Sequence, residues 1–563
     1  MAFSLSPLAS IERLQAPRLS VAVGIFAAIG LTAIALQIRY GLQGDISWLI
    51  TLDEKWLDGE TPYRDFIEIN PPASLMLYWP AVALARLAGV RPEFTVAAFG
   101  FVSIGASAAL CAAILRRANL FERIAPLGLG AALVTLAILP GQSFDERDEL
   151  AMLYGLPLLA LAAARSGRRP IDWRLAVLSG LGAGLMAAIK PPYALVALAV
   201  VPYLLSRIGV RAFFACLEIY VAAGVGLAYL AVVAWDFPIY VSQVLPLGVT
   251  LYAPIREPLA VLLCAPGALM LAALAAATAR IAGGRLREPM IAVPALGALG
   301  AFAAYLVQGK GWLYQIYPAL ALMTLAAAMA LELRPAPRPR ALLCVLAALV
   351  AALAVLWLAR APLPIALAAA LGAAALEARF EPAGDWKTGF AEMAVAGCLG
   401  AACGLYAADG LRTPALQRAL ASLGPHPSLA AISESLAFGH PMVRAVDGVW
   451  AQSVPDLLMA SAARWLIDAH PGDAALATKL QPYIAADRDR LVADIRRNRP
   501  DALLVGRLDT RFHQWIWNDP AVAAACANYR LFAENPDPNF PAALYVRKDL
   551  LGLRTTVENA GGS

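Results

Sequence analysis

The sequence predicts a polytopic all-α membrane protein of about thirteen transmembrane helices, followed by a smaller α/β domain outside the membrane. Its composition is the first observation: 60% of the 563 residues are apolar and 15% are charged, whereas soluble domains have about 45–50% and about 25%. Second, the apolar residues form runs long enough to cross a bilayer. Third, Lys and Arg gather in short clusters between these runs, and the net charge is only +5. These observations exclude a disordered protein, a disulfide scaffold and an ordinary cytosolic enzyme, and they indicate membrane lipid rather than nucleic acid as a partner.

The apolar runs place the predicted transmembrane helices. A helix that crosses a bilayer needs about 20 mostly apolar residues. The runs cover residues 19–38, 93–115, 124–140, 150–165, 172–189, 192–208, 212–234, 256–279, 288–308, 313–332, 340–358, 362–378 and 388–408. Arginine-rich clusters fall at every second connection, and cytoplasmic loops carry the excess of Lys and Arg. We therefore expect a multi-pass protein of the plasma (inner) membrane with a cytoplasmic N-terminus and an extracytoplasmic C-terminal domain.

One further apolar stretch, residues 72–89, is predicted to lie in the outer leaflet instead of crossing it. If it crossed, the arginines at 116, 117 and 123 would be placed outside. Pro71 and Pro72 open the stretch, and a helix can lie at the interface where protein covers its polar backbone groups. Residues 39–92 then form a first outer loop with juxtamembrane helices.

The predicted domain boundary follows residue 408, where the last apolar run ends. Residues 1–408 form the predicted membrane domain, and residues 409–563 form the extracytoplasmic domain with all four histidines. Its patterns are helical at 455–469 and 473–497 and strand-like at 441–446, 502–506 and 542–547. This alternation predicts a small α/β fold. The histidines lack the spacing of metal ligands, so no metal site is expected among them.

Asp53 and Glu54, in the first outer loop, are the first candidates for catalysis. A carboxylate at the membrane surface can accept a proton from an attacking hydroxyl when its site is partly desolvated. The alternative is that the pair consists of solvated charges that cap a short interfacial helix. Tyr63 and Glu68 are candidates for lining a substrate site in the same loop, although aromatic residues are enriched at membrane interfaces in any case.

The second outer loop has four carboxylates around one arginine, in the run Asp145-Glu146-Arg147-Asp148-Glu149. Asp145 and Asp148 are the candidates for an acidic role there. Carboxylate oxygens can position a substrate, a divalent cation or one another, so a metal cofactor is left open. The alternative is a solvated helix start with acidic residues in its first turn.

Lys190 and Lys310 each end an apolar run on the predicted outer side, where positive charge is otherwise sparse. A lipid that carries a phosphate places it at this depth, and ammonium and guanidinium groups bind phosphate there. Together with Arg147 and Arg256, the two lysines form a predicted site for such a phosphate, which would be that of the donor if the chain transfers a group from a lipid carrier. The alternative is that each lysine only extends to the interface without a functional role.

The first outer loop resembles that of the GT-C glycosyltransferases. The run ISWLITLDEKWLDGETPYRDFIEINPPASLMLYWP at 46–80 has an Asp-Glu pair after the first helix and a Pro-Pro dipeptide that opens a juxtamembrane helix. Within this superfamily, the run is most similar to the aminoarabinose transferase and protein O-mannosyltransferase branch. The resemblance implies a GT-C-like membrane domain, with Asp53 at the position of the catalytic aspartate and Glu54 as its neighbour.

Later turns resemble the family less specifically. The resemblance implies that Asp145 or Asp148 contributes an acidic group to the site. The runs IKPPY and QGKGWLYQIYP look like family turns in which a lysine precedes aromatic residues and proline. Tyr314 and Gln315 thereby become candidates for lining the substrate site. Many relatives carry a histidine where this chain has Gln315, and this departure argues against proton transfer at that position.

The predicted reaction moves a hexose or pentose from a polyprenyl-phosphate-type donor to an envelope glycan, lipid or protein. Nucleotide sugars are cytosolic, whereas the expected site faces outward, so the donor should arrive on a lipid carrier. Asp53 would act as general base and the cations would stabilise the departing phosphate, and the resemblance implies inversion at the anomeric carbon. The alternatives are a transporter or flippase of a lipid-linked sugar and a non-catalytic subunit of polysaccharide assembly. Charges that cluster in outer loops, without a visible inverted repeat, favour the enzyme.

Overall fold

The computed structural model describes residues 24, 26–120, 126–333, 386–408, 413–535, 537 and 540–551. The chain forms two compact units, each assembled from three separate stretches. The helical unit consists of Met1–Gly41, Ala97–Ala228 and Glu257–Asp409. The mixed unit consists of Leu42–Val96, Tyr229–Arg256 and Gly410–Ser563. Most of the first outer loop and the C-terminal region therefore belong to the same unit.

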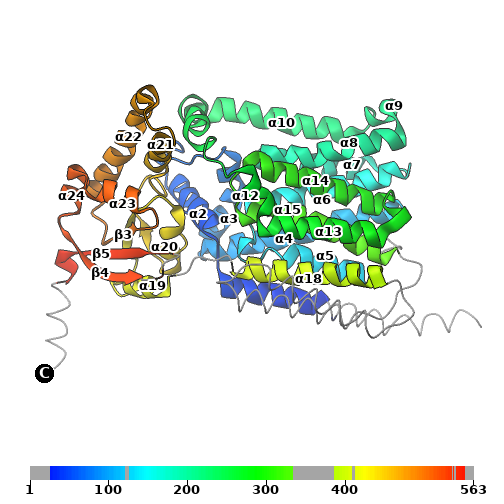
Figure 1. The fold of residues 1–563 in the computed structure, drawn as a ribbon, viewed down its shortest axis with the longest axis horizontal. Coiled ribbons are helices and arrows are strands. Elements are labelled where there is room, and N and C mark those ends of the chain that lie inside the picture. The colour runs from blue at the N-terminus through cyan, green and yellow to red at the C-terminus, as the bar shows by residue number, and fades with distance from the viewer. Residues whose placement is uncertain are drawn as a thin grey trace, which may run out of the picture. The chain divides into compact units, whose positions relative to one another are not determined.

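Long apolar helices that run side by side build the helical unit (Figure 1). Within the described residues, eight helices are long and apolar enough to cross a membrane, which makes the chain an integral membrane protein. These helices are α4 (Pro92–Arg117), α6 (Arg147–Ser166), α8 (Ala194–Ile208) with the turn η3 (Pro191–Tyr193), α10 (Leu217–Asp236), α13 (Pro266–Ala282), α14 (Pro289–Gln308), α15 (Leu313–Glu332) and α18 (Trp386–Ala408). Shorter helices are Phe26–Tyr40, α5 (Pro126–Ala137), α7 (Trp173–Ile189), α9 (Val210–Phe213) and α12 (Leu259–Cys264).

Most predicted transmembrane segments correspond to observed helices, and the predicted segment 313–332 coincides with α15. The predicted segments 340–358 and 362–378 lie outside the described residues, so the total of thirteen stays a prediction. The predicted start at residue 256 is wrong, because α12 ends at Cys264 and the long helix α13 begins at Pro266. Proline is favoured in the first turn of a helix but interrupts a helix interior, since it has no backbone N–H.

Glycines allow the helices that carry the candidate residues to pack closely. A Cβ atom on Gly182 in α7 would lie 2.3 Å from the backbone oxygen of Tyr154 in α6. A Cβ atom on Gly300 in α14 would lie 2.3 Å from the backbone oxygen of Leu195 in α8. Small residues at such positions bring helix backbones together where lipid provides no hydrophobic driving force.

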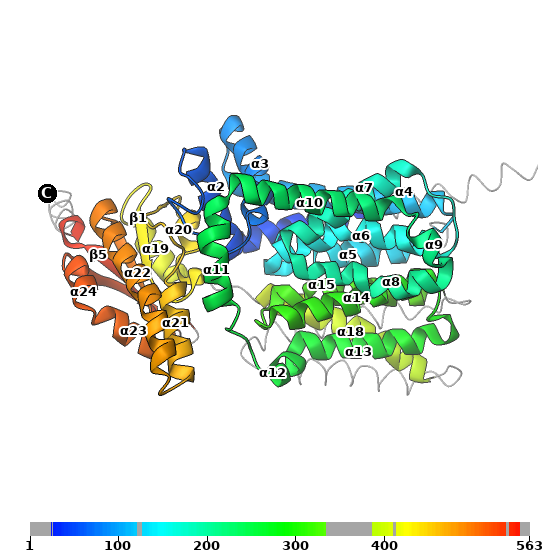
Figure 2. The same ribbon diagram turned by 90° about the horizontal axis from the view of Figure 1, so that it is seen from above.

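The first outer loop forms two helices in the mixed unit, α2 (Gly44–Leu57) and α3 (Ala73–Ala88). The helix α3 begins directly after Pro72, as predicted, and exposes large apolar side chains that include Leu84 and Leu87. The connection at 235–256 is helical and contains η4 (Tyr240–Val244), α11 (Leu245–Leu247) and η5 (Gly248–Tyr252). This connection is helical because Leu247 and Leu251, four residues apart, share one helix face. Both are buried in an apolar cluster with α21 (Leu458–Ala469) and α22 (Ala474–Asn498). Figure 2 shows α11 beside these two helices.

The C-terminal part of the mixed unit is a five-stranded sheet with helices packed on it, which confirms the predicted α/β fold. The strands are β1 (Ser428–Ile432), β2 (Val449–Trp450), β3 (Ala502–Gly506), β4 (Tyr529–Asn535) and β5 (Ala542–Arg547), in the order β2-β1-β3-β5-β4. The strands β2, β1 and β3 are parallel, and β5 is antiparallel to β3 and β4. The remaining helices are α19 (Pro414–Ala421), α20 (Met442–Ala445), α23 (Thr510–Trp517) and α24 (Pro520–Cys526). The predicted strands at 502–506 and 542–547 coincide with β3 and β5.

The predicted strand at 441–446 is wrong, because this run forms the short helix α20. Met442 and Val443 are consecutive and both buried, whereas a strand with one buried face alternates buried and exposed side chains. Such short apolar runs do not distinguish a helix from a strand by periodicity alone. The helical turn also lets the side chain of Arg444 reach the first outer loop, as described below.

Candidate active site

Asp53 is buried in the last turns of α2 and is fully inaccessible to solvent. Neither of its carboxylate oxygens accepts a hydrogen bond from the residues that the structure describes. Burial raises the pKa of Asp53 well above its usual value, and the negative charge of Glu54 raises it further. A buried carboxyl group without donors is costly in a folded protein, which indicates a functional position.

Glu54 is held by Arg444 and is not a free acid. Atom Nη1 of Arg444 lies 2.5 Å from Oε2 of Glu54, and Nη2 lies 3.1 Å from Oε1, so the guanidinium binds this carboxylate with two nitrogens. The Nε atom of Arg444 donates to Glu93 at 2.8 Å, and Nη1 donates to Thr51 at 3.2 Å. Arg444 therefore ties α2 and the start of α4 to α20. Sequence analysis missed this residue, because nothing distinguishes a single arginine in a short apolar run.

His440, just before α20, makes a second contact between this part of the chain and α2. Its Nδ1 atom lies 3.1 Å from the hydroxyl of Ser47, and its ring packs against Trp48 and Trp450 with centroid distances of 5.4 and 4.6 Å. Burial, together with the charge of Arg444, lowers the pKa of His440 to about 3. The imidazole is therefore neutral at physiological pH and shares a hydrogen bond with Ser47.

Tyr63 and Glu68 are both buried within the first outer loop. The Tyr63 hydroxyl donates to the backbone oxygen of Asn70 at 3.1 Å, and its ring lies 5.1 Å from that of Tyr240. Glu68 accepts a hydrogen bond of 2.6 Å from the indole of Trp48 and one of 2.8 Å from the backbone N–H of Asn70. These contacts fix the shape of the loop between α2 and α3.

Replacing Arg444 by Ala should destabilise the mixed unit by about 2–3 kcal/mol, because the carboxylates of Glu54 and Glu93 then lose the buried guanidinium that they share, and Glu93 keeps only Arg91. The value lies below that of a fully buried pair because the side chain of Glu54 is 40% exposed. Thermal unfolding followed by tryptophan fluorescence would report the change, since Trp48 and Trp450 lie in this region. The control Arg86→Ala removes a pair with Asp58 whose side chains are both more than half exposed, and it should change stability little. Equal stabilities of the two variants would contradict the role of Arg444.

A second cluster of polar residues lies in the helical unit, at the ends of α6, α7, α14 and α15. Nζ of Lys190 lies 2.6 Å from Oδ2 of Asp148, and the two side chains are only 12% and 0% exposed. The hydroxyl of Tyr193 donates to Oδ1 of Asp148 at 2.6 Å, and Gln308 accepts from Lys190 at 3.3 Å. The same ammonium lies 5.2 Å from the ring centroid of Tyr314, within the range of a cation–π contact. The structure thus brings together Asp148, Lys190 and Tyr314, which the sequence singled out separately.

Asp145 lies just before α6 in a strained backbone conformation, with φ of 68°. Its backbone N–H donates to Oε2 of Glu149 at 2.6 Å, and its side chain lies so close to α4 that a Cβ on Gly100 would come within 2.7 Å of Oδ1. Burial raises the pKa of Asp145 well above its usual value. Arg147 begins α6 and is also buried. Five consecutive charged residues, 145–149, are therefore inside the protein and do not form a solvated helix start.

The remaining candidates occupy the turns that the sequence predicted. Lys310 lies half-buried between α14 and α15, and Gln315 is buried in the first turn of α15. The backbone oxygen of Gln315 accepts from Tyr193 at 3.1 Å, which joins it to the lysine cluster. Arg256 is exposed and belongs to the mixed unit. Among the described residues, no group of His, Cys, Asp and Glu side chains is arranged to hold a metal ion.

No known family model and no curated protein matches the chain by sequence. Two solved structures do match: ArnT from Cupriavidus metallidurans bound to undecaprenyl phosphate and the same protein in the apo state. The first aligns with a TM-score of 0.54 and 15% sequence identity over 93% of this chain and 97% of that protein. The apo structure gives the same score and identity over 95% and 99%. ArnT is an aminoarabinose transferase of the GT-C superfamily, so the similarity confirms, at the level of the fold, the resemblance predicted from residues 46–80.

Proposed function

We propose that this protein is a glycosyltransferase that moves a sugar from a polyprenyl-phosphate donor to an envelope acceptor. The observation that carries the proposal is Asp53, a buried carboxyl group without hydrogen-bond donors among the described residues. It stands at the position of the catalytic aspartate in the resembling family. The fold supports the proposal, because the similar ArnT structure has undecaprenyl phosphate bound. We also infer an inner-membrane location, a cytoplasmic N-terminus and an outward C-terminal domain from the arginine clusters.

In the proposed reaction, Asp53 removes the proton from an acceptor hydroxyl, whose oxygen attacks the anomeric carbon of the donor. The bond between that carbon and the phosphate oxygen breaks, and polyprenyl phosphate leaves with the electron pair. This is a single displacement with inversion, and the sugar is a hexose or a pentose. Glu54 contributes through its negative charge, which raises the pKa of Asp53 and so makes the carboxylate a stronger base.

The departing phosphate requires positive charge at its oxygens. We assign this role to Arg147, Lys190, Lys310 and Arg256. Of these, Lys190 is the best defined, because Asp148, Gln308 and Tyr314 hold its ammonium in place. Asp148 and Asp145 act by orienting these cations and the acceptor, and Tyr314 and Gln315 line the site of transfer.

The test compares envelope glycans of a deletion strain with those of strains that carry the chain or its Asp53→Asn variant. Mass spectrometry should show the loss of one glycosyl residue on deletion, restoration by the unaltered chain and no restoration by the variant. The lipid-linked sugar should accumulate in the outer leaflet. Accumulation in the inner leaflet instead would favour a flippase and contradict the proposal.

A further inference from the structure

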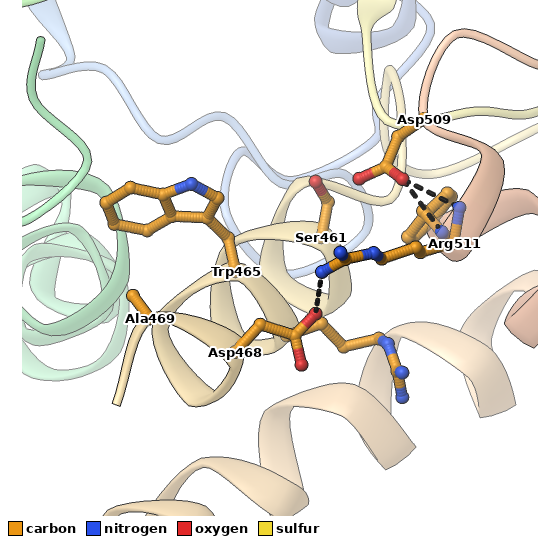
Figure 3. A pocket seen from close by; sticks show the side chains of 8 residues that line it. Ser461, Trp465, Asp468, Ala469, Asp509 and Arg511 are labelled. Atoms are coloured by element: carbon orange, nitrogen blue, oxygen red, sulfur yellow. Dashed lines mark hydrogen bonds and ion pairs between the residues drawn. The ribbon is translucent and has the colours of Figure 1, made fainter. Parts of the chain in front are cut away.

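A cavity of about 280 Å³ opens in the C-terminal part of the mixed unit, and none of the candidate residues described above lines it (Figure 3). Its lining includes Ser461, Arg464, Trp465, Asp468, Asp509 and Arg511. The cavity therefore combines an aromatic ring, two guanidinium groups and two carboxylates. The proposed chemistry uses none of these residues.

One face of α21 provides most of this lining. Arg464 and Trp465 follow Ser461 by three and four residues, and Asp468 follows them by four and three, so the four residues share a helix face. The opposite face is buried in an apolar cluster and consists of Met459, Ala462, Ala463 and Leu466. Trp465 lies on the face that lines the cavity, and it is 48% exposed. An exposed indole beside polar groups is typical of a binding surface.

The other side of the cavity comes from the start of α23, where Asp509 is the N-cap residue and Arg511 lies in the first turn. The strands β1 and β3 are parallel neighbours, so their carboxyl ends meet at one edge of the sheet. The strand β2 lies next to β1 on one side and β3 lies next to β1 on the other side, so the strand order reverses at β1. Ligands of open α/β sheets bind outside the carboxyl ends of strands at such a switch in strand order. Glu434, just after β1, accepts a hydrogen bond of 2.9 Å from the backbone N–H of Asp509 and so fixes the turn at this edge.

The charged groups of the cavity contact neighbouring groups, and their charges sum to zero. Nη1 of Arg511 lies 4.0 Å from Oδ2 of Asp468, and the guanidinium of Arg464 lies 4.8 Å from the ring centroid of Trp515. Asp509 accepts hydrogen bonds from the backbone N–H groups of Arg511 and Phe512. Carboxylates and guanidinium groups pair with neighbouring hydroxyls, and an aromatic face packs against apolar C–H groups. A sugar ring presents both kinds of surface.

We propose that this cavity binds an uncharged sugar ring of the acceptor. The inference rests on the proposed transferase function, and it narrows the acceptor to a molecule that already carries sugar. Because two aspartates balance two arginines, the cavity suits a neutral ring better than a phosphate or a carboxylate. The C-terminal part of the mixed unit thereby acquires a role in acceptor recognition.

The test uses the full chain in lipid nanodiscs and the methyl glycosides of glucose, galactose, mannose and N-acetylglucosamine as probes. Saturation-transfer NMR should show binding of at least one probe. Trp465→Ala should weaken that binding about tenfold, because one well-placed aromatic contact is lost. Trp465→Phe keeps an aromatic ring and should retain most of the affinity. The control Trp173→Ala removes a more exposed indole, 63% exposed, from the helical unit and should bind normally.

Three results would overturn the proposal: no methyl glycoside binds, the Trp465→Ala variant binds the glycoside as well as the unaltered chain does, or inorganic phosphate displaces the glycoside. If Trp465→Ala unfolds, Asp468→Asn provides the same comparison, because it removes a carboxylate acceptor and leaves the indole. The Asp53→Asn variant separates this inference from the proposed function. It should bind the glycoside normally while it fails to transfer sugar, whereas normal transfer by that variant would contradict the proposed function alone.

Discussion

Replacing Asp53 by Asn should lower the rate of sugar transfer about 10²–10⁴-fold, the usual contribution of a general base. The amide has nearly the same shape but cannot accept the proton of the acceptor hydroxyl. Because the substitution leaves the cations of the helical unit unchanged, donor binding should persist. Transfer would be measured with purified protein in nanodiscs, and binding of undecaprenyl phosphate by native mass spectrometry.

The matched control is Asp58→Asn, which removes an exposed carboxylate just after the same helix and should transfer sugar at the normal rate. A variant Asp53→Asn that transferred sugar as well as this control would exclude Asp53 as the base. The prediction therefore distinguishes a catalytic carboxyl group from a buried residue that only supports the fold.

The pH dependence of transfer should also report on Asp53. Since its pKa is raised, the carboxyl group keeps its proton to a higher pH, and the rate should increase with pH as that proton is lost. Glu54→Gln removes a negative charge that contributes to the shift, so the rising limb of the pH profile should move to lower pH. A profile that did not move would show that the limb belongs to another group.

Replacing Lys190 by Gln should weaken binding of undecaprenyl phosphate and also destabilise the helical unit. The second effect follows because Asp148 is fully buried and would lose its ion-pair partner, which costs about 3–5 kcal/mol for a buried pair. The first follows if Lys190 binds the departing phosphate, as we propose, because its ammonium is then lost. Native mass spectrometry would measure lipid binding, and thermal unfolding would measure stability.

The double variant Asp148→Asn with Lys190→Gln separates these two effects. It leaves no unpaired charge at positions 148 and 190, so most of the stability should return. Lipid binding should remain weak, because no positive charge has been restored at this position. If the double variant bound undecaprenyl phosphate normally, Lys190 would have only a structural role.

Sequence analysis succeeded where the determining property is local. The hydropathy of residues 313–332 predicts α15 without reference to any other segment, and the short apolar run 502–506 predicts β3 in the same way. The Pro-Pro pair of the first outer loop likewise predicted the start of α3, whereas the role of Asp53 stays a prediction. The strand predicted at 441–446 was wrong, because a short apolar run fits a helix or a strand equally well.

The sequence by itself therefore determined that this is a membrane protein, where most of its described helices lie, and which carboxylate to test first. Only the tertiary structure decided which charges are paired. Arg444 meets Glu54 across 390 positions of the chain, and Lys190 meets Asp148 across 42. Such partners depend on how distant segments pack together, whereas hydropathy and turn residues act over a few neighbouring positions. For the same physical reason, the sequence left open whether the charged run 145–149 is a site or a solvated helix start, and only the fold showed that it is buried.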